Sequence, residues 1–337
     1  MISIFQKEYI QQTSAYIALI LLLFIVLGFH IVPGLIAGLL SYVLTKNFLK
    51  AIEFKIPNNL TKVKIVGLIV GMTSFGILSG LIFLTIKALN GENVSGLINT
   101  LAETISNSKD LLPEAIAAYI PESVMEIKEV FINAIKSHMQ EFANIGRGAL
   151  HSFLLVLIGW LVGILIACKK PTKDKTLFSK TWDDLWFKLS NAFKFVVFAQ
   201  IKVAAFNSFV MAIFLFIVTP IFDWHIPYSK MLILITFLCG LLPIIGNLIS
   251  NTISFLLAFT VSLHAAIGAL VVLMLIHKLE YLIISKSLGS DIDSDIWELL
   301  IILFSFEILF GVAGMVFSPI IYAFFKQEMR NFGWLPK

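Results

Sequence analysis

Residues 231–262 read MLILITFLCGLLPIIGNLISNTISFLLAFTVS, and this stretch decides the class of fold. It is longer than the roughly 20 apolar residues that one membrane-spanning helix needs. Helix-breaking and polar residues interrupt it near the middle. These are Gly240, Pro243, Gly246 and Asn247. The arms on either side, residues 231–242 and 248–262, are each too short to cross a bilayer. The stretch therefore predicts two short helices joined by a break inside a membrane.

A second long apolar run, residues 296–325, is interrupted in the same way. The interrupting residues are Gly311, Gly314 and Pro319. Lipid cannot satisfy the backbone N–H and C=O groups that a break releases, so these groups must face protein, water or a solute. Two broken runs in matching positions favour a solute or ion pathway at the breaks. The alternative is that the glycines only permit close helix packing and the prolines only kink the helices.

The composition of the whole chain supports a membrane protein. Of its 337 residues 58% are hydrophobic and 14% are charged, against about 45–50% and about 25% in soluble domains. Mean hydropathy is +0.93. A water-soluble globule could not bury so much apolar surface. The sequence predicts an all-α polytopic membrane protein and excludes a disordered chain, a disulfide scaffold and a nucleic-acid binder.

The remaining apolar runs predict the membrane crossings. They cover residues 15–29, 32–48, 63–86, 149–168, 195–222 and 265–284. Lysines cluster after the second and fourth of these runs, which places those loops in the cytoplasm by the positive-inside rule. We therefore expect six crossings plus two re-entrant helical hairpins, with both termini cytoplasmic. The last two crossings, each followed by a hairpin, would form an inverted repeat.

This topology divides the chain into four parts. We expect three membrane helices in residues 1–89, an external helical segment in 90–148, a fourth helix with a basic cytoplasmic loop in 149–194, and the inverted-repeat transport core in 195–337. The external segment repeats apolar residues at helical spacing. These are Ile127, Phe131, Ile135, His138 and Phe142. The spacing predicts an amphipathic helix that caps the membrane domain or a neighbouring subunit, more than a ligand-binding domain.

Three motifs resemble those of one transporter family. Residues 241–247 (LLPIIGN), 310–319 (FGVAGMVFSP) and 32–42 (VPGLIAGLLSY) resemble the signatures of the autoinducer-2 exporter family, also called PerM-like permeases. Gln200 stands where the family often has a glutamine. The sequence departs from the pattern at Ile244 and Asn247, where the family has tyrosine and a second proline.

The resemblance implies a bacterial inner-membrane protein that forms a homo-oligomer, with a pentamer as one arrangement. It implies an exporter of a small signalling molecule, a sodium or lithium/proton antiporter, or a non-transporting envelope or sporulation scaffold. The partners expected on these grounds are the lipid bilayer, a small solute or ion, and further copies of the chain, with no nucleic acid.

Polar residues within the apolar runs are further pathway candidates. Gln200 and Asn207 lie seven residues apart and so share one helical face. They line the pathway or form hydrogen bonds between helices. Lys202 is a coupling candidate, or else it extends to the cytoplasmic surface.

Three other titratable residues are coupling candidates. His277 and Glu280 are three residues apart, close enough to pair on a helix, and imidazole titrates near neutral pH. Glu307 has no charged residue within eight positions on either side. Burial in lipid would favour its neutral form, which suits coupling to protons or sodium. The alternatives are a solvated cluster for the first pair and a buried hydrogen bond to another helix for Glu307.

The sequence carries no pattern for catalysis, metal binding or a cofactor. It has no phosphate-binding glycine loop, no metal-spaced cysteine and histidine cluster, and no nucleophile with a base. Asp291, Asp293 and Asp295 imitate the start of a calcium loop but lack its glycine and closing glutamate. We therefore expect no catalytic residues, no metal, no cofactor and no enzymatic activity.

Overall fold

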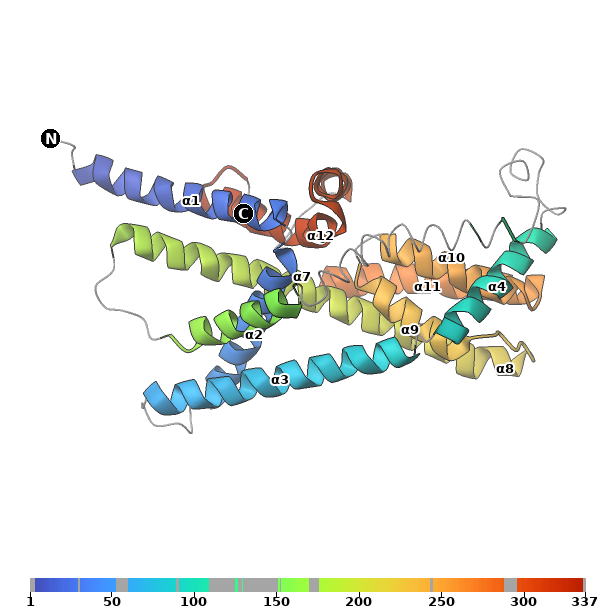
Figure 1. Cartoon of the computed structure of the whole chain (residues 1–337). Helices are drawn as coiled ribbons and strands as arrows, with labels where there is room; N and C mark the ends of the chain where they lie inside the picture. The colour runs from blue at the N-terminus through green and yellow to red at the C-terminus, as the bar shows by residue number, and fades with distance from the viewer. Residues whose placement is uncertain are drawn as a thin grey trace. The chain divides into compact units, whose positions relative to one another are not determined.

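The computed structural model describes residues 4–29, 31–52, 60–88, 91–108, 125–126, 129, 151, 153–169, 176–242, 245–287 and 296–335. Within these residues the regular structure is helical and no strand occurs, which confirms the predicted all-α class (Figure 1). Among the described residues, four helical segments are long and apolar enough to cross a membrane. They are Gln6–Gly28, Val32–Ala51, Lys64–Thr85 and Leu177–Ile221. The count of six crossings stays a prediction.

The helices follow one another along the chain as follows. They are α1 (Ile4–Gly28), α2 (Val32–Ile52), α3 (Leu60–Ala88), α4 (Gly91–Ser108), the helix Phe153–Ala167, α7 (Leu177–Ile213), a π-helical turn (Phe214–Val218), α8 (Thr219–Ile221), α9 (Ser229–Gly240), α10 (Ile245–Phe259), α11 (Leu263–Ser287) and α12 (Ile296–Asn331).

The basic segment before the fifth apolar run is helical, whereas we expected a loop there. Residues 177–194 form the first half of α7 and continue into the apolar run without a break. Leu185, Leu189 and Phe193 recur on one face and are fully buried. Lys188 and Asp184 form an ion pair one helical turn apart, at 2.8 Å. The lysines that indicate a cytoplasmic location thus alternate with an apolar face that stabilises a helix.

The chain divides into two compact units. Unit 1 comprises Met1–Gly80, Arg147–Val197 and Ile292–Lys337, and unit 2 comprises Leu81–Gly146 and Phe198–Asp291. Each unit is described by itself below.

In unit 1, α2 and the helix Phe153–Ala167 pack backbone against backbone. A methyl group on Gly159 or Gly163 would overlap the carbonyl oxygen of Gly34 or Gly38, respectively. Both helices thus carry glycines four residues apart at the contact, the packing that small residues allow between membrane helices. Trp160 then joins α3, because its indole Nε1–H donates to the carbonyl of Gly71 at 2.8 Å.

In unit 2, the helices share one apolar core. It includes Leu215, Leu232, Leu257 and Ala269, from the π-helical turn, α9, α10 and α11. Leu97 and Leu101 of α4 are buried in the same core, and α4 packs on α10. The beginning of the expected external segment therefore covers the helices of unit 2. The five residues whose spacing predicted an amphipathic helix, from Ile127 to Phe142, lie outside the described residues.

Candidate functional site

The first predicted break is present between α9 and α10. The helix α9 ends at Gly240 and α10 begins at Ile245, and the two helices pack against each other. They contain 12 and 15 residues, about 18 and 22 Å of helix, short of the roughly 30 Å hydrocarbon core. Pro243 lies outside the described residues.

Gly246 brings the two ends of this break into backbone contact. The residue is buried, and a Cβ atom there would overlap the carbonyl oxygen of Cys239. Only glycine leaves room for this approach. The first turn of α10 therefore packs directly on the backbone at the end of α9, and a larger residue at position 246 would push the two helices apart.

Gln200 binds the end of α9. Its amide Nε2 donates to the carbonyl oxygen of Gly240 at 2.7 Å. This carbonyl is among the last four of the helix, which have no partner within the helix. Gln200 thus lies beside the first break and forms a hydrogen bond between two helices, which is one of its two expected roles. Its part in a pathway stays a prediction. Asn207 is buried, with 3% exposed, on the same helix.

A polar face runs along α10 from the break. Asn247, Ser250, Asn251 and Ser254 recur at helical spacing, and the two serines are buried. Asn251 Nδ2 lies 3.0 Å from Nε2 of His277 on α11. His277 therefore contacts an asparagine of the broken pair. The side chain of Glu280 lies outside the described residues, so the expected pair of His277 and Glu280 stays a prediction.

The second predicted break is present at Gly311. Its φ of 66° and ψ of −160° lie inside α12 and are not helical. This combination of positive φ and extended ψ is essentially restricted to glycine. The break divides α12 into an N-terminal arm (residues 296–310) and a C-terminal arm (residues 312–331).

The two arms of α12 fold back on each other. At the closed end, a Cβ atom on Gly314 would lie 2.5 Å from the carbonyl oxygen of Phe306. At the open end, Lys326 Nζ lies 2.9 Å from Oε2 of Glu298, and the hydroxyl of Tyr322 donates to the same carboxylate. Contacts between residues 24 and 28 positions apart require antiparallel arms.

Two details of the second hairpin differ from expectation. Pro319 lies inside the C-terminal arm and does not form the break, because Gly311 alone departs from helical geometry. The C-terminal arm also continues to Asn331, beyond the expected end at Phe325. The last turn of this arm is polar, so a helix end predicted from the length of the apolar run comes too early in the sequence.

The isolated charges among the candidates are on the surface of the structure. Glu307 is exposed on the N-terminal arm of α12, and Lys202 is exposed on α7. Both roles considered for Glu307, coupling and a hydrogen bond to another helix, stay predictions. The breaks near Gly246 and at Gly311 belong to different units, and the solute or ion pathway expected at both breaks stays a prediction.

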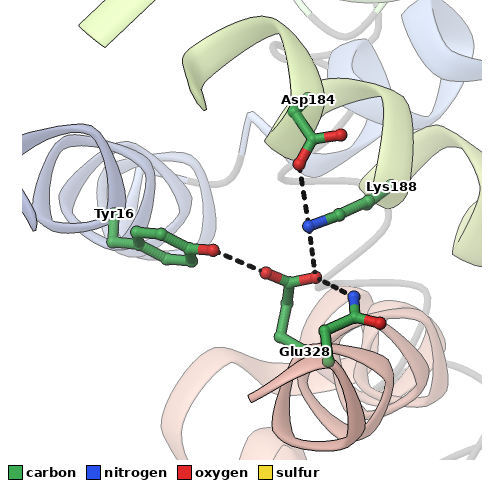
Figure 2. A network of polar contacts seen from close by, with 5 residues as sticks. Tyr16, Asp184, Lys188 and Glu328 are labelled. Carbon is green, nitrogen blue, oxygen red and sulfur yellow. Dashed lines mark hydrogen bonds and ion pairs between the residues drawn. The ribbon is translucent and has the colours of Figure 1, made fainter. Parts of the chain in front are cut away.

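A buried carboxylate, not predicted from the sequence, joins three helices of unit 1. Glu328, on the C-terminal arm of α12, is 4% exposed. Figure 2 shows its partners. Tyr16 of α1 donates its hydroxyl to Oε2 at 2.7 Å, and Lys188 of α7 lies 2.9 Å from Oε1. Asn331 donates to Oε1 at 2.8 Å. We call these residues, with Asp184, the Glu328 network.

The network satisfies the lone pairs of a carboxylate that could not otherwise be buried. Only one part of it could have been found in the sequence, namely the spacing of Asp184 and Lys188, which suits an ion pair on a helix. The contact of Tyr16 with Glu328 joins residues 312 positions apart, and no local pattern predicts it.

Comparison with known proteins identifies the family of the chain. Residues 14–333 match the family model described as AI-2E family transporter. A search of curated proteins gives no match. The match covers nearly the whole chain, including both broken runs, Gln200 and the Glu328 network. With an apolar composition and helical structure throughout the regular elements described, the chain is a membrane transport protein and belongs to the AI-2E transporter family.

Proposed function

We propose that this protein is a secondary transporter that exports a small solute across the bacterial inner membrane, and that the solute passes along the two helix breaks. One observation carries the proposal. Two apolar segments are broken, and each break has a glycine that no other residue can replace: Gly246 by its close contact beside the first break, and Gly311 by its conformation at the second. Paired breaks of this kind are where membrane transporters bind their substrates.

The chemistry available at the first break suits a polar solute. A broken helix presents carbonyl oxygens at the end of one arm and N–H groups at the start of the next. Gln200 occupies the carbonyl of Gly240, and the polar face of α10 leads away from the break through Asn247 and Asn251 to His277. A solute that moves along this face would exchange hydrogen bonds with side-chain amides and hydroxyls.

A sodium or lithium/proton antiporter is the second candidate. Its support is Glu307, an exposed carboxylate just before Gly311 within an apolar arm. Charged groups inside membrane segments face a water-filled cavity or a partner and mark ion pathways. Under this alternative Glu307 would carry the coupling ion, with His277, Glu280 or Lys202 as the other titrating group.

The proposed arrangement in the membrane is six crossings and two re-entrant hairpins with both termini in the cytoplasm, in a homo-oligomer. The antiparallel arms of α12 and the short helices α9 and α10 support the two hairpins, because each hairpin returns toward the side from which it enters. Cysteines placed singly at Ser262 and Lys326 test the arrangement. We expect labelling of position 262 only from outside and of position 326 only from inside.

Flux in proteoliposomes tests the function. The purified protein is reconstituted with autoinducer-2 inside, and the solute that appears outside is measured with and without sodium, lithium and proton gradients. We expect export that Gly311→Leu and Gly246→Leu abolish while the protein still assembles. Gly76→Leu is the matched control, because a Cβ at that position on α3 meets no atom within 4 Å.

The envelope or sporulation scaffold predicts a different result. A scaffold would lose its cellular role when residues 90–148 are replaced and would keep it with Gly311→Leu. Ion-driven sodium or lithium flux without autoinducer-2 export would favour the antiporter instead.

A further inference from the structure

We propose that Glu298 and Glu328 are positioning residues of α12 with opposite tasks. Glu328 fixes the C-terminal arm to α1 and α7, and Glu298 holds the N-terminal arm in a closed position that it leaves during transport. The inference rests on the proposed function, since it assigns to the break at Gly311 the role of a hinge.

The C-terminal arm is packed like a core helix of unit 1. Buried side chains line it. They are Met315, Phe317, Ser318, Ile320, Ile321, Ala323 and Phe324. Glu328 then ties its end to Tyr16 and Lys188 through a carboxylate that is 4% exposed (Figure 2). Removing the partners of a buried carboxylate leaves an uncompensated charge, so this connection resists opening.

The N-terminal arm is held far more loosely. Among its described side chains, residues 297–310, Leu303 alone is buried. Large apolar side chains along it are exposed, with Ile308 at 79% and Leu309 at 69%. Near the hinge, the ring of Phe310 meets that of Phe24 on α1 at 5.9 Å between centroids.

The far end of the N-terminal arm is joined to the C-terminal arm through Glu298. Its carboxylate binds Lys326 and Tyr322, and the side chains of Glu298 and Lys326 are 30% and 12% exposed. A partly exposed ion pair is weak and readily exchanged with water, unlike a buried one. The lysines do not make this difference, because Lys188 is 22% exposed and Lys326 is 12% exposed. The carboxylates make it: Glu328 is buried and bound from three helical segments, whereas Glu298 is 30% exposed and is bound only from the C-terminal arm in the contacts described above.

The hinge itself leaves room for rotation. A Cβ atom on Gly311 would meet no atom within 4 Å, so no neighbouring side chain is wedged against this position. Glycine also permits backbone conformations on both sides of φ = 0. Release of Glu298 would let the N-terminal arm pivot about Gly311 while the C-terminal arm stays in place.

Distances between spin labels test this division. The full chain, with Cys168→Ser and Cys239→Ser, carries labels at exposed positions of unit 1. One pair joins Gln12 on α1 to Ser305 on the N-terminal arm, and the other joins Gln12 to Gln327 on the C-terminal arm. We expect Glu298→Gln to increase the long-distance population of the first pair at least fivefold and to leave the second pair unchanged.

The controls separate a released contact from general damage. The exchange of charges, Glu298→Lys with Lys326→Glu, should restore the first distance, because the ion pair forms again. Glu103→Gln, which neutralises an exposed carboxylate on α4, should alter neither pair. Glu328→Gln should change the distance between the labels of the second pair. If that variant does not fold, Tyr16→Phe, which removes one hydrogen bond to Glu328, should give a smaller change in the same distance. An unchanged first pair in Glu298→Gln, or an equal change in both pairs, overturns the proposal.

A reversible cross-link tests whether the contact between Glu298 and Lys326 must open during transport. Cysteines that replace Glu298 and Lys326 are joined by a short, reducible bis-methanethiosulfonate reagent in proteoliposomes loaded with autoinducer-2. We expect at least a tenfold fall in export that dithiothreitol reverses, whereas undiminished export with a complete cross-link refutes the hinge. The distance measurements need no flux, so a chain that exports nothing in any form contradicts the proposed function and still tests the two carboxylates.

Discussion

The conformation of Gly311 leads to the sharpest prediction about this protein. In Gly311→Ala the new methyl group has no neighbour within 4 Å to clash with. The whole effect must then come from the backbone, which would hold an L-residue at a φ of 66° and a ψ of −160°. Such conformations cost roughly 1–3 kcal/mol. The antiparallel arms of α12 should lose that free energy relative to states in which the arms separate.

This cost corresponds to roughly a 5- to 150-fold shift in the equilibrium between closed and open arms. Spin labels on Ser305 and Gln327, one on each arm, report the two populations directly in the reconstituted protein. We expect Gly311→Ala to convert a narrow short-distance peak into a mixture or into long distances, and to lower the midpoint of thermal unfolding in detergent.

Two other glycines give matched controls. Gly76→Ala adds a methyl group in open space on α3, at a helical position, and should be neutral or stabilising by about 0.5–1 kcal/mol. Gly314→Ala should also open the arms, through overlap with the carbonyl oxygen of Phe306. If Gly311→Ala keeps the distance populations of the parent protein, the hairpin does not depend on its positive φ and the reasoning is wrong.

Three further predictions concern other contacts. Gly163→Ala should lower the free energy of unfolding in detergent by roughly 1–3 kcal/mol, because its methyl group meets the backbone of Gly38; a loss below about 0.5 kcal/mol would contradict the packing of these helices. Gln200→Ala should destabilise by about 1 kcal/mol and reduce export, since it removes the hydrogen bond to the end of α9, and unchanged export would remove this residue from the pathway. If Glu307 couples transport to protons, as the antiporter alternative proposes, Glu307→Gln should keep the fold and abolish the pH dependence of flux, whereas a flux that keeps its pH response would exclude Glu307 as a coupling residue.

The breaks could be predicted from the sequence because their cause is local. A glycine or proline inside an apolar run disturbs the helix in which it stands, so Gly246 and Gly311 are visible without any knowledge of packing. Pro319 shows the limit of this reasoning. Proline in a helix removes one hydrogen bond, but membrane helices tolerate it, and the C-terminal arm of α12 continues through it.

The Glu328 network could not be predicted, because its cause is tertiary. Glu328 stands in a polar turn between Lys326 and Arg330, where a solvated glutamate is the ordinary expectation. Only the folded chain shows that Tyr16 and Lys188 converge on it. The helix at residues 177–194 could not be predicted for a related reason. The lysines there indicate a cytoplasmic loop, and only the folded chain shows that the apolar residues between them form a buried face.

The glycine contact between α2 and the helix Phe153–Ala167 has a consequence for permeation. A Cβ atom on Gly159 or Gly163 would overlap a carbonyl oxygen of α2, so neither an acyl chain nor a hydrated ion fits between the two helices at this contact. This joint therefore acts as a seal, and leakage along it is prevented without any gate. Whatever route the cargo takes, it does not run between these two helices, and a mutation that loosens them would produce a passive leak before it altered selectivity.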